Sequence, residues 1–427
     1  MRLLLFDGSP QARGRFNPLA WSHPIWELRC GITTLAEKLH ARLNPDDVAC
    51  FVPEYMAEAY AQRTQWKVND TAALASEDLL AVNARVKAAS LDVTGTGPSE
   101  VGLAQDGEVL YARVAATDAG KLNRQDFEGF LESAKAALPA KTVLLPTYNY
   151  IWELILENPG QITADFQALG RSGIEGTVEQ PTAIRGEGKN VYVGRGAVVH
   201  PVVVLDAEGG PIYLDEGVQV HPFTRIEGPC YVGRKSILLG TKCREGNSIG
   251  PVCRVGGEVE ESVILGYTNK YHDGFLGHAY VGEWVNLGAL TTNSDLKNDY
   301  SAVSVILDGR HPISTGSTKV GSLIGDHTKT SIGTLFNTGA YVGAMGLLMA
   351  TGKVLPKFIP SFSCLLDGLV TKGFGKNSLY ATAKVAMGRR NCQWTQADEK
   401  MWDAVYEMTA PARETAIRRA RKTMFRA

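Results

Sequence analysis

The chain has 427 residues, of which 44% are apolar and 21% are charged, and its formal net charge is −1. This is the composition of an ordinary globular protein, and the near-neutral charge gives no overall field to attract nucleic acid, so a nucleic-acid partner is not expected. The length exceeds one compact core and predicts two or three domains. No apolar run approaches the ~20 residues that span a bilayer, so no membrane partner is expected.

The cysteines and the first residues favour a cytoplasmic protein. The seven cysteines are odd in number, and none has zinc-ligand spacing, so we expect reduced, mostly packing cysteines. Met1–Asp7 reaches an acidic residue before any long apolar run, which predicts a first strand rather than a signal peptide.

Residues 1–170 alternate between short apolar runs and helical patterns. Arg2–Phe6 and Leu79–Val82 have the pattern of buried strands, and residues 32–43 have helical spacing. Strands that alternate with helices predict an α/β, Rossmann-like domain with a mostly parallel sheet. The polar, glycine-rich residues 171–190 predict a linker.

Residues 191–360 carry a different pattern. Of the 45 glycines, 28 fall from Gly186 to Gly352, and many follow an aliphatic residue, as in Ile249-Gly250 and Val255-Gly256, six residues apart. An inward aliphatic residue every six positions is typical of a left-handed parallel β-helix, whose corners are turned by small residues. A β-sandwich would need longer alternating strands and fits poorly. Residues 257–264 and 294–320 break the period and are expected to bulge as loops.

Residues 361–427 return to helical spacing and predict a C-terminal helical extension. From Thr351 to Ala427 there are 14 Lys or Arg and 6 Asp or Glu. The basic helix expected at Glu414–Phe425 either caps the end of the β-helix or binds phosphate or RNA. The absence of interleaved aromatic residues favours the cap.

The densest group of polar residues in the predicted β-helix is Gly266–Gly277, followed by Val285–Ala289 and Thr291–Asp295. His272 precedes a strand and is expected at the edge of a coil rather than inside it. Acyl transfer from a thioester needs a base for the incoming amine or hydroxyl and donors for the oxyanion. A neutral imidazole suits the first task, and asparagine amides suit the second. Three other histidines rank below His272: His278, His311 and His327.

This stretch resembles the acetyltransferase half of the bifunctional family of UDP-N-acetylglucosamine pyrophosphorylase and glucosamine-1-phosphate N-acetyltransferase. That family has a Gly-Ser-Lys-x-x-His-x-x-Tyr-x-Gly motif, then Val-Asn-x-Gly-Ala-Gly and Thr-x-Asn-Tyr-Asp-Gly. The resemblance implies that His272 is the catalytic base and Asn286 an active-site residue, and that Asn293 contacts acyl-CoA and the acceptor. Phe275 stands where the family has a sugar-contacting Tyr, and Asn269 where it has a Lys.

The same resemblance implies further site residues and partners. Lys270, one place along, is expected to supply the missing charge in the catalytic site, and Lys329 to contact the cofactor. Substrate contacts are expected from three neighbours: Asn269, Tyr271 and Asp273. The acyl donor would be acetyl-CoA, and the assembly a homotrimer with sites between neighbouring prisms.

The N-terminal region is similar to a branch of the sugar nucleotidyltransferases that is fused to hexapeptide repeats. The likeness is carried by Phe6-Asp7-Gly8, Pro18-Leu19, Glu27–Ile32 and Tyr267–Gly277. Nucleotidyltransferases hold the triphosphate in a glycine-rich loop after the first strand. The loop is glycine-poor here, so three arginines are expected to clamp the phosphates instead: Arg13, Arg15 and Arg29.

Such enzymes also imply Mg²⁺ bound after a central strand. The nearest equivalents here are Asn83, which is a neutral and weaker ligand for a hard cation, and Glu153. Both are candidate metal ligands.

The sequence therefore predicts a bifunctional transferase of sugar-nucleotide synthesis in the cytoplasm. An acyltransferase would act on an amino sugar phosphate or nucleotide sugar, and a nucleotidyltransferase would join a sugar 1-phosphate to a nucleoside triphosphate, most plausibly UTP. One alternative keeps only the acyltransferase, with an N-terminal domain that recognises sugar nucleotide. The other is a non-catalytic structural or regulatory hexapeptide-repeat protein.

Overall fold

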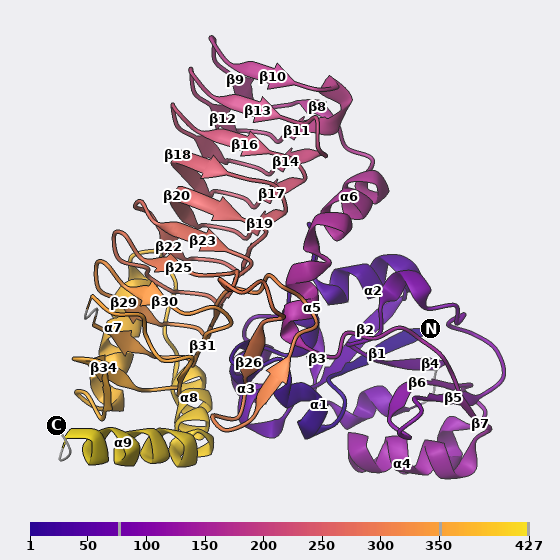
Figure 1. The fold of residues 1–427 in the computed structure, drawn as a ribbon. Helices are drawn as coiled ribbons and strands as arrows, with labels where there is room; N and C mark the ends of the chain where they lie inside the picture. The colour runs from indigo at the N-terminus through magenta and orange to yellow at the C-terminus, as the bar shows by residue number, and fades with distance from the viewer. Residues whose placement is uncertain (76–77, 350–351, 425–427) are drawn as a thin grey trace.

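The computed structural model describes residues 1–75, 78–349 and 352–424. An N-terminal α/β region lies against the lower part of a tall column of stacked coils, and C-terminal helices lie at the base of that column (Figure 1). Among the described residues, no helix combines the length and the apolarity needed to cross a bilayer.

The N-terminal region is built on a seven-stranded sheet with the order β3-β2-β1-β4-β6-β5-β7. Its strands are β1 (Arg2–Phe6), β2 (Asp47–Phe51), β3 (Lys67–Val68), β4 (Leu79–Asn83), β5 (Glu100–Leu103), β6 (Val109–Val114) and β7 (Ala140–Thr142). β6 runs antiparallel to both of its neighbours, whereas the other pairs are parallel. The predicted α/β class, with a mostly parallel sheet, is confirmed.

Helices cover both faces of this sheet, because side chains alternate between the faces along each strand. The helices of this region are α1 (Pro10–Gly14), α2 (Leu35–Leu43), α3 (Glu54–Ala61), α4 (Phe127–Ala137), α5 (Ile151–Leu156) and α6 (Asn158–Leu169), of which α6 lies against the column instead of the sheet. Leu4 and Phe6 share a buried cluster with Phe130 of α4, whereas Leu3 and Leu5 face the opposite cluster.

The column is the predicted left-handed parallel β-helix, and its coils have three sides. The first side contains β8 (Gly173–Ile174), β11 (Val191–Val193), β14 (Ile212–Leu214), β17 (Cys230–Val232), β19 (Asn247–Ile249), β21 (Val263–Ile264), β24 (Tyr280–Val281), β28 (Leu323–Ile324), β31 (Tyr341–Val342) and β33 (Phe358–Ile359). All its pairings are parallel and in register.

The second and third sides share two long strands, β18 (Ile237–Cys243) and β20 (Arg254–Glu260), which bend from one side to the next. The second side also contains β9 (Thr177–Val178), β12 (Val198–Val199), β15 (Gln219–Val220), β22 (Asn269–Lys270), β29 (Lys329–Thr330), β32 (Leu347–Leu348) and β34 (Cys364–Leu366). The third side contains β10 (Ala183–Arg185), β13 (Val204–Asp206), β16 (Arg225–Glu227), β23 (Phe275–Gly277), β25 (Thr292–Asn293) and β30 (Leu335–Phe336).

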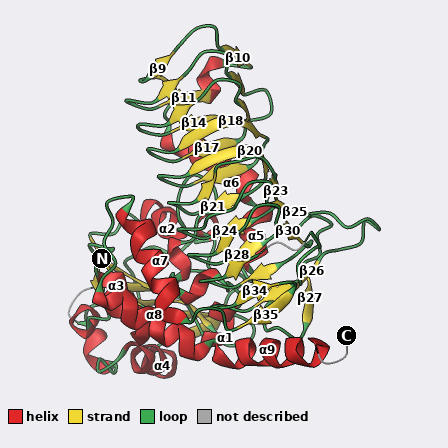
Figure 2. Ribbon diagram, turned by 90° about the vertical axis from the view of Figure 1, so that its left-hand side faces the viewer, coloured by secondary structure: helices red, strands yellow, loops and turns green. Residues whose placement is uncertain are grey.

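The structure differs from the sequence-based expectation at two places. Residues 171–190, expected to be a linker, contain β8, β9 and β10, which pair with the next coil and form the first turn of the column. Residues 257–264 do not bulge, because β20 continues to Glu260 and the coil is only shortened. Residues 294–320 do form an excursion, with the hairpin of β26 (Ser304–Ile306) and β27 (Pro312–Ser314) beside the lower coils (Figure 2).

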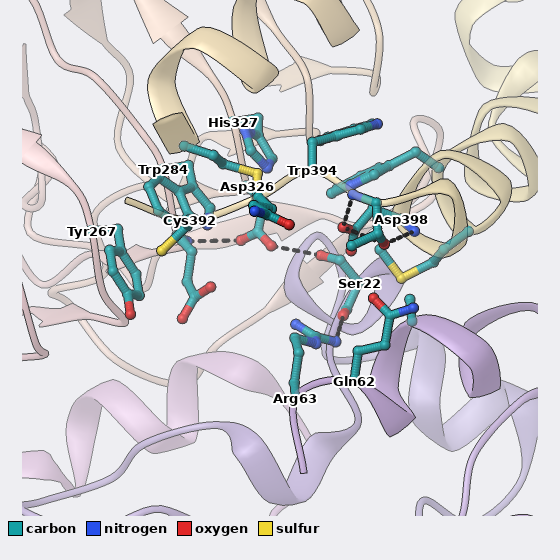
Figure 3. Close-up of a pocket in the computed structure, with 17 residues that line it drawn as sticks. Ser22, Gln62, Arg63, Tyr267, Trp284, Asp326, His327, Cys392, Trp394 and Asp398 are labelled. Atoms are coloured by element: carbon teal, nitrogen blue, oxygen red, sulfur yellow. Dashed lines mark hydrogen bonds between the residues drawn. The ribbon is translucent and has the colours of Figure 1, made fainter. Parts of the chain in front are cut away.

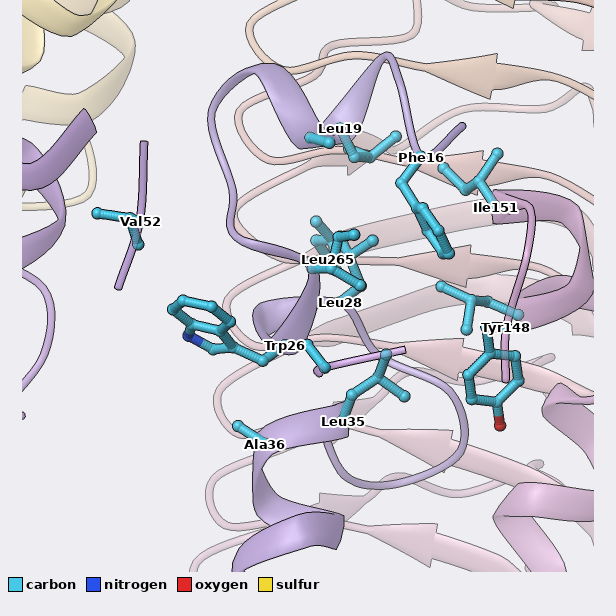
Figure 4. Close-up of a cluster of buried hydrophobic side chains, with 14 of the residues drawn as sticks. Phe16, Leu19, Trp26, Leu28, Leu35, Ala36, Val52, Tyr148, Ile151 and Leu265 are labelled. Atoms are coloured by element: carbon cyan, nitrogen blue, oxygen red, sulfur yellow. The ribbon is translucent and has the colours of Figure 1, made fainter. Parts of the chain in front are cut away.

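The N-terminal region docks on the first side of the column through a ladder of outward tyrosines. Tyr192, Tyr213 and Tyr231 pack together with Phe166 of α6. Lower down, the Tyr280 hydroxyl accepts a hydrogen bond from the Arg29 backbone N–H at 2.8 Å. Leu19, Trp26 and Leu28 join Leu265 of the column in one continuous buried cluster (Figure 4). Because this core spans both parts, the two are fixed relative to one another rather than merely tethered.

The chain ends in three helices, α7 (Lys376–Gly388), α8 (Gln396–Met408) and α9 (Ala410–Met424), after β35 (Leu369–Thr371) has paired antiparallel with β34. α8 lies against α3 of the N-terminal region, and α9 lies against β35. Ile417 of the basic helix α9 joins the buried interior cluster of the column. The helix therefore closes the base of the β-helix, which is the expected cap.

Candidate functional site

His272 lies on an exposed corner of the column, in the bend between β22 and β23, where the second side turns into the third. Its carbonyl oxygen accepts a hydrogen bond from Lys270 Nζ at 2.7 Å, and its ring meets the Tyr271 ring edge-on at 5.1 Å. The backbone of the bend is thus held from inside the column, while the imidazole stays outside. This is the orientation that the sequence predicted for a base. Tyr271 and Asp273, the expected substrate contacts, are exposed on the same corner.

Lys270 has a different position from the one that its expected catalytic role requires. Its side chain is 1% exposed and points into the column, where Nζ donates to the Gly256 carbonyl at 2.8 Å and to that of His272. Burial lowers its pKa to about 8, although Asp273 acts in the opposite direction. Lys270 therefore fixes the corner backbone and presents no charge to a ligand there.

Asn269 and Asn286 lie one above the other on the outer face of the second side. Asn269 Nδ2 donates to Asn286 Oδ1 at 3.3 Å, and Arg390 Nη2 donates to Asn269 Oδ1 at 3.1 Å. Asn286 is exposed, and within the described residues no hydrogen bond engages its Nδ2 group. That amide can donate to a ligand, as an oxyanion donor must.

Asn293 and Lys329, the expected cofactor contacts, are engaged within the column. Asn293 is 2% exposed, and its amide accepts from the Gly277 N–H and donates to the Gly277 carbonyl, both at 2.8 Å. Lys329 Nζ donates to the carbonyls of Trp284 and His327, and burial lowers its pKa to about 8. Both side chains tie neighbouring coils together through these hydrogen bonds.

The loop after β1, which includes the short helix α1, contains Arg13, which the sequence assigned to a phosphate. Arg13 is 8% exposed, and its Nε atom pairs with the Asp7 carboxylate at 2.9 Å. The guanidinium also donates to Tyr55 Oη at 3.0 Å and to the carbonyl of Ala20. The N–H donors of Arg13 therefore bind other protein groups and hold the loop in place.

The other two arginines lie elsewhere. Arg29 stacks on the Tyr231 ring of the column at 5.1 Å, so it belongs to the contact between the two parts rather than to the loop. Arg15 is half-buried and rests on the Tyr150 ring at 5.5 Å, and only this one of the three remains near the loop with its charge unpaired among the described residues.

A carboxylate occupies the position over the loop where the sequence placed a phosphate. The Ser9 N–H donates to Glu108 Oε1 at 3.1 Å, and the other oxygen of Glu108 pairs with Arg85. Gly8 has φ +78°, and a Cβ atom there would lie 2.4 Å from Glu108 Oε1, so only glycine permits this approach.

The two candidate metal ligands, Asn83 and Glu153, make hydrogen bonds within the protein. Asn83 is fully buried, and its amide donates to the Val109 carbonyl and accepts from the Arg85 N–H. Glu153 accepts from the Asn149 N–H at 2.7 Å, and burial raises its pKa. Within the described residues, the one group of three or more close His, Cys, Asp or Glu ligands lies in the β-helix and comprises Glu245, Glu260 and Glu261.

A cavity of about 360 Å³ lies where the N-terminal region, the column and the C-terminal helices meet (Figure 3). Its lining includes Arg63, Tyr267, Trp284, His327 and Trp394. Sequence reasoning missed this site and ranked His327 low. The one available signal was the spacing of 17 residues between Tyr267 and Trp284, which is one coil of the column and stacks their rings at 4.2 Å.

Comparison with known proteins gives the N-terminal region a family. Residues 3–172 match the sugar nucleotidyl transferase family. A relative from Sulfurisphaera tokodaii, named a bifunctional sugar-1-phosphate nucleotidylyltransferase/acetyltransferase, is 37% identical over 87 residues, or 20% of this chain and 21% of that protein. The bifunctional protein GlmU of Synechococcus elongatus is 26% identical over 208 residues, or 48% of this chain and 39% of that protein.

The chain spans between about a fifth and two fifths of the length of the curated relatives it matches. A solved UDP-N-acetylglucosamine acyltransferase shares 14% identity and a TM-score of 0.25, covering 58% of this chain and 94% of that one. Residues 3–172 are therefore similar to the sugar nucleotidyl transferase family, and a left-handed parallel β-helix and a C-terminal helical region follow them.

Proposed function

We propose that the chain is an acyltransferase whose reaction takes place at the His272 corner of the β-helix. The observation that carries the proposal is that His272 points outward while Lys270 holds its backbone from inside. Neighbouring Tyr271 and Asp273 are exposed and able to contact an acceptor. The names of the bifunctional relatives, which include an acetyltransferase, support the same reaction class.

The reaction needs one base and one oxyanion donor. The imidazole of His272 takes a proton from the acceptor amine as the nitrogen attacks the thioester carbonyl. The Nδ2 group of Asn286 donates to the developing oxyanion. Collapse of the tetrahedral intermediate forms the amide and expels the thiolate, which takes the proton back from the imidazolium. The expected donor is acetyl-CoA, and the acceptor an amino sugar phosphate or nucleotide sugar, in the cytoplasm.

The corner of His272 also carries the surface that we assign to a homotrimer. Apolar side chains project from the same corner in two coils above that of His272 and two below it, with exposed fractions of 49% for Val202, 79% for Phe223, 61% for Leu290 and 72% for Ile332. The two coils directly above His272 have Gly240 and Gly257 there. An exposed apolar ridge on a repetitive scaffold is typical of a protein–protein contact. A neighbouring copy packed on this ridge would cover one side of His272 and complete the site.

The matched family favours a second activity in the N-terminal domain, namely nucleotidyl transfer from a nucleoside triphosphate such as UTP to a sugar 1-phosphate, with Mg²⁺ as the expected metal. Glu108 lies over the loop and must move before a triphosphate can reach the Ser9 N–H. Pyrophosphate release from a panel of nucleoside triphosphates and sugar 1-phosphates with Mg²⁺ tests this activity. If no combination of substrates releases pyrophosphate, the domain has a recognition or structural role instead.

The acyltransferase is tested by thiol release from acetyl-CoA with amino sugar phosphates and nucleotide sugars as acceptors. His272→Ala should lower the rate by about 10²- to 10⁴-fold, the usual contribution of a general base. The matched control is His311→Ala, since His311 is exposed on the hairpin excursion and pairs with Asp308. Equal rates in both variants would remove His272 from the reaction. Failure of CoA to raise the melting temperature would favour a non-catalytic protein.

A further inference from the structure

The cavity between the three parts of the chain opens at a different corner of the column from that of His272. It opens at the corner where the first side turns into the second, whereas His272 lies where the second turns into the third. Arg63 follows α3 of the N-terminal region, Trp284 comes from the column, and Trp394 precedes α8 (Figure 3). A volume of about 360 Å³ is within the range of small-molecule sites.

One wall of the cavity is a stack of rings along the edge of the column. The Tyr267 and Trp284 rings are 4.2 Å apart at an interplanar angle of 12°, and the His327 ring follows Trp284 at 6.2 Å and 10°. Two further rings, of Trp394 and Trp402, meet His327 edge-on at 5.9 Å and 5.7 Å.

These rings occupy corner positions with unfavourable backbone angles. Tyr267, Trp284 and His327 have φ values of 53°, 59° and 59°, and the left-handed region costs a bulky residue about 1–2 kcal/mol. The two uppermost coils have glycine at the equivalent corner, Gly196 and Gly217, but Lys235 and Val252 in the next two coils also have positive φ values, 57° and 59°. The left-handed corner is therefore a feature of the repeat, and it brings outward side chains of neighbouring coils into line, which is why these rings stack.

The charged groups behind the wall leave one carboxylate without a counterion. Asp326 accepts from His23 Nε2 and from Ser22 Oγ, each at 2.8 Å. His23 also pairs with the Glu27 carboxylate, and Arg63 Nη1 lies 3.9 Å from an oxygen of Glu27. Two cations thus balance Asp326 and Glu27.

Glu283 has no such partner. Its backbone N–H donates to Asp326 Oδ1, but within the described residues no hydrogen bond or ion pair engages its carboxylate. Asp398, the other lining carboxylate, is already used by the N-terminus of α8, where it accepts from the Thr395 N–H and hydroxyl. Burial raises the pKa of Glu283, whereas the His23 and Arg63 cations act in the opposite direction from a distance. The cavity therefore presents a carboxylate that no group among the described residues contacts directly, beside aromatic rings.

His327 adds an unused polar atom. The side chain is 7% exposed, and its Nδ1 atom has no hydrogen-bond partner. Burial, together with the nearby Lys329 ammonium, lowers its pKa to about 3, so the ring is neutral. Buried polar atoms are normally satisfied, so this nitrogen is an exception within the described residues, but it is enclosed and not presented to the cavity.

We propose that this cavity binds a small molecule with a protonated amine on a flat or compact apolar body. The ammonium group pairs with the Glu283 carboxylate, and the body lies against the edges of the stacked rings, because Tyr267 and His327 cover the two faces of Trp284. The carboxylate favours a cation, because it can accept a charge-assisted hydrogen bond from an ammonium group. An anion would meet Glu283 and Asp326, and a neutral ring would leave Glu283 unpaired. The site is independent of the proposed acyl transfer.

The proposal is tested by measuring how tightly three fragments bind to the full chain, with calorimetry and ligand-observed NMR. The fragments are benzylamine, benzyl alcohol and benzoate. Benzylamine should bind at least about tenfold more tightly than its neutral counterpart, as expected for one charge-assisted hydrogen bond. Glu283→Gln should remove this preference and leave the affinity for benzyl alcohol unchanged. The matched control, Glu216→Gln, changes an exposed carboxylate of an upper coil and should keep the preference.

A second variant keeps the test decisive if Glu283→Gln does not fold. Gln62 is exposed and lines the cavity, so Gln62→Trp should obstruct it and weaken benzylamine binding without disturbing a core. Benzoate binding as tightly as benzylamine would overturn the proposal, as would undiminished benzylamine binding in both variants. His272→Ala should retain the site, so a failed acyl-transfer assay and a failed amine site are distinguishable.

Discussion

The loop after β1 and the corner of the β-helix were both predicted to bind ligands, but they use their polar side chains in different ways. In the loop, Arg13 is buried and bonded within the protein, and so is Asn83 at the end of β4. On the β-helix, His272 of the corner and Asn286 of the second side are exposed, whereas Lys270 points inward. Exposure, rather than residue type, separates groups that can meet a ligand from groups that hold the fold.

The largest expected effect on stability comes from a substitution in the loop, where the polar side chains hold the fold. Arg13→Ala leaves the Asp7 carboxylate, which is 4% exposed, without its cation. Breaking a buried ion pair costs about 3–5 kcal/mol of unfolding free energy, which urea denaturation measures. Arg15→Ala is the control, because a ring contact of a partly exposed arginine is worth about 1 kcal/mol or less. Equal losses in the two variants would mean that Arg13 is not the structural residue inferred here.

Lys270 provides a test through pH. Burial lowers its folded pKa from 10.5 to about 8, so between these values the unfolded chain binds more protons than the folded one. The unfolding free energy of the wild type therefore rises with pH in this window. Relative to that of Lys270→Met, which has no amine to titrate, the rise is on the order of 2–3 kcal/mol. Urea denaturation at pH 7.5 and 10.5 measures the change. Lys242→Met, at an exposed lysine, should show no such slope. Parallel curves for wild type and Lys270→Met would place the amine in solvent.

The architecture was predictable because it repeats. Aliphatic residues before corner glycines, as at Ile249-Gly250, recur in nearly every coil, so a single error does not change the fold. The roles of single side chains were not predictable in this way. Successive residues of a strand face opposite sides, so a shift of one position moves a side chain from solvent to the interior. Asn269 and Lys270 are such a pair, as are Thr292 and Asn293. Nor could the sequence show that Glu108 lies over Gly8, since that contact joins separate strands.

The smallest expected effect separates two asparagines to which the resemblance gave one function. Asn293→Ala removes two buried hydrogen bonds to Gly277 and leaves that backbone unsatisfied, at a cost of about 1–3 kcal/mol. Asn286→Ala changes an exposed side chain, so its unfolding free energy should stay within about 0.5 kcal/mol of the wild type. For activity the order reverses: the folded Asn293→Ala protein keeps its rate of acyl transfer, and Asn286→Ala loses rate because its oxyanion donor is gone. Denaturation and thiol release measured on the same preparations decide the matter. If Asn293→Ala proved the slower enzyme and the more stable protein, the inward-facing residue would be the functional one, and the distinction by exposure would fail.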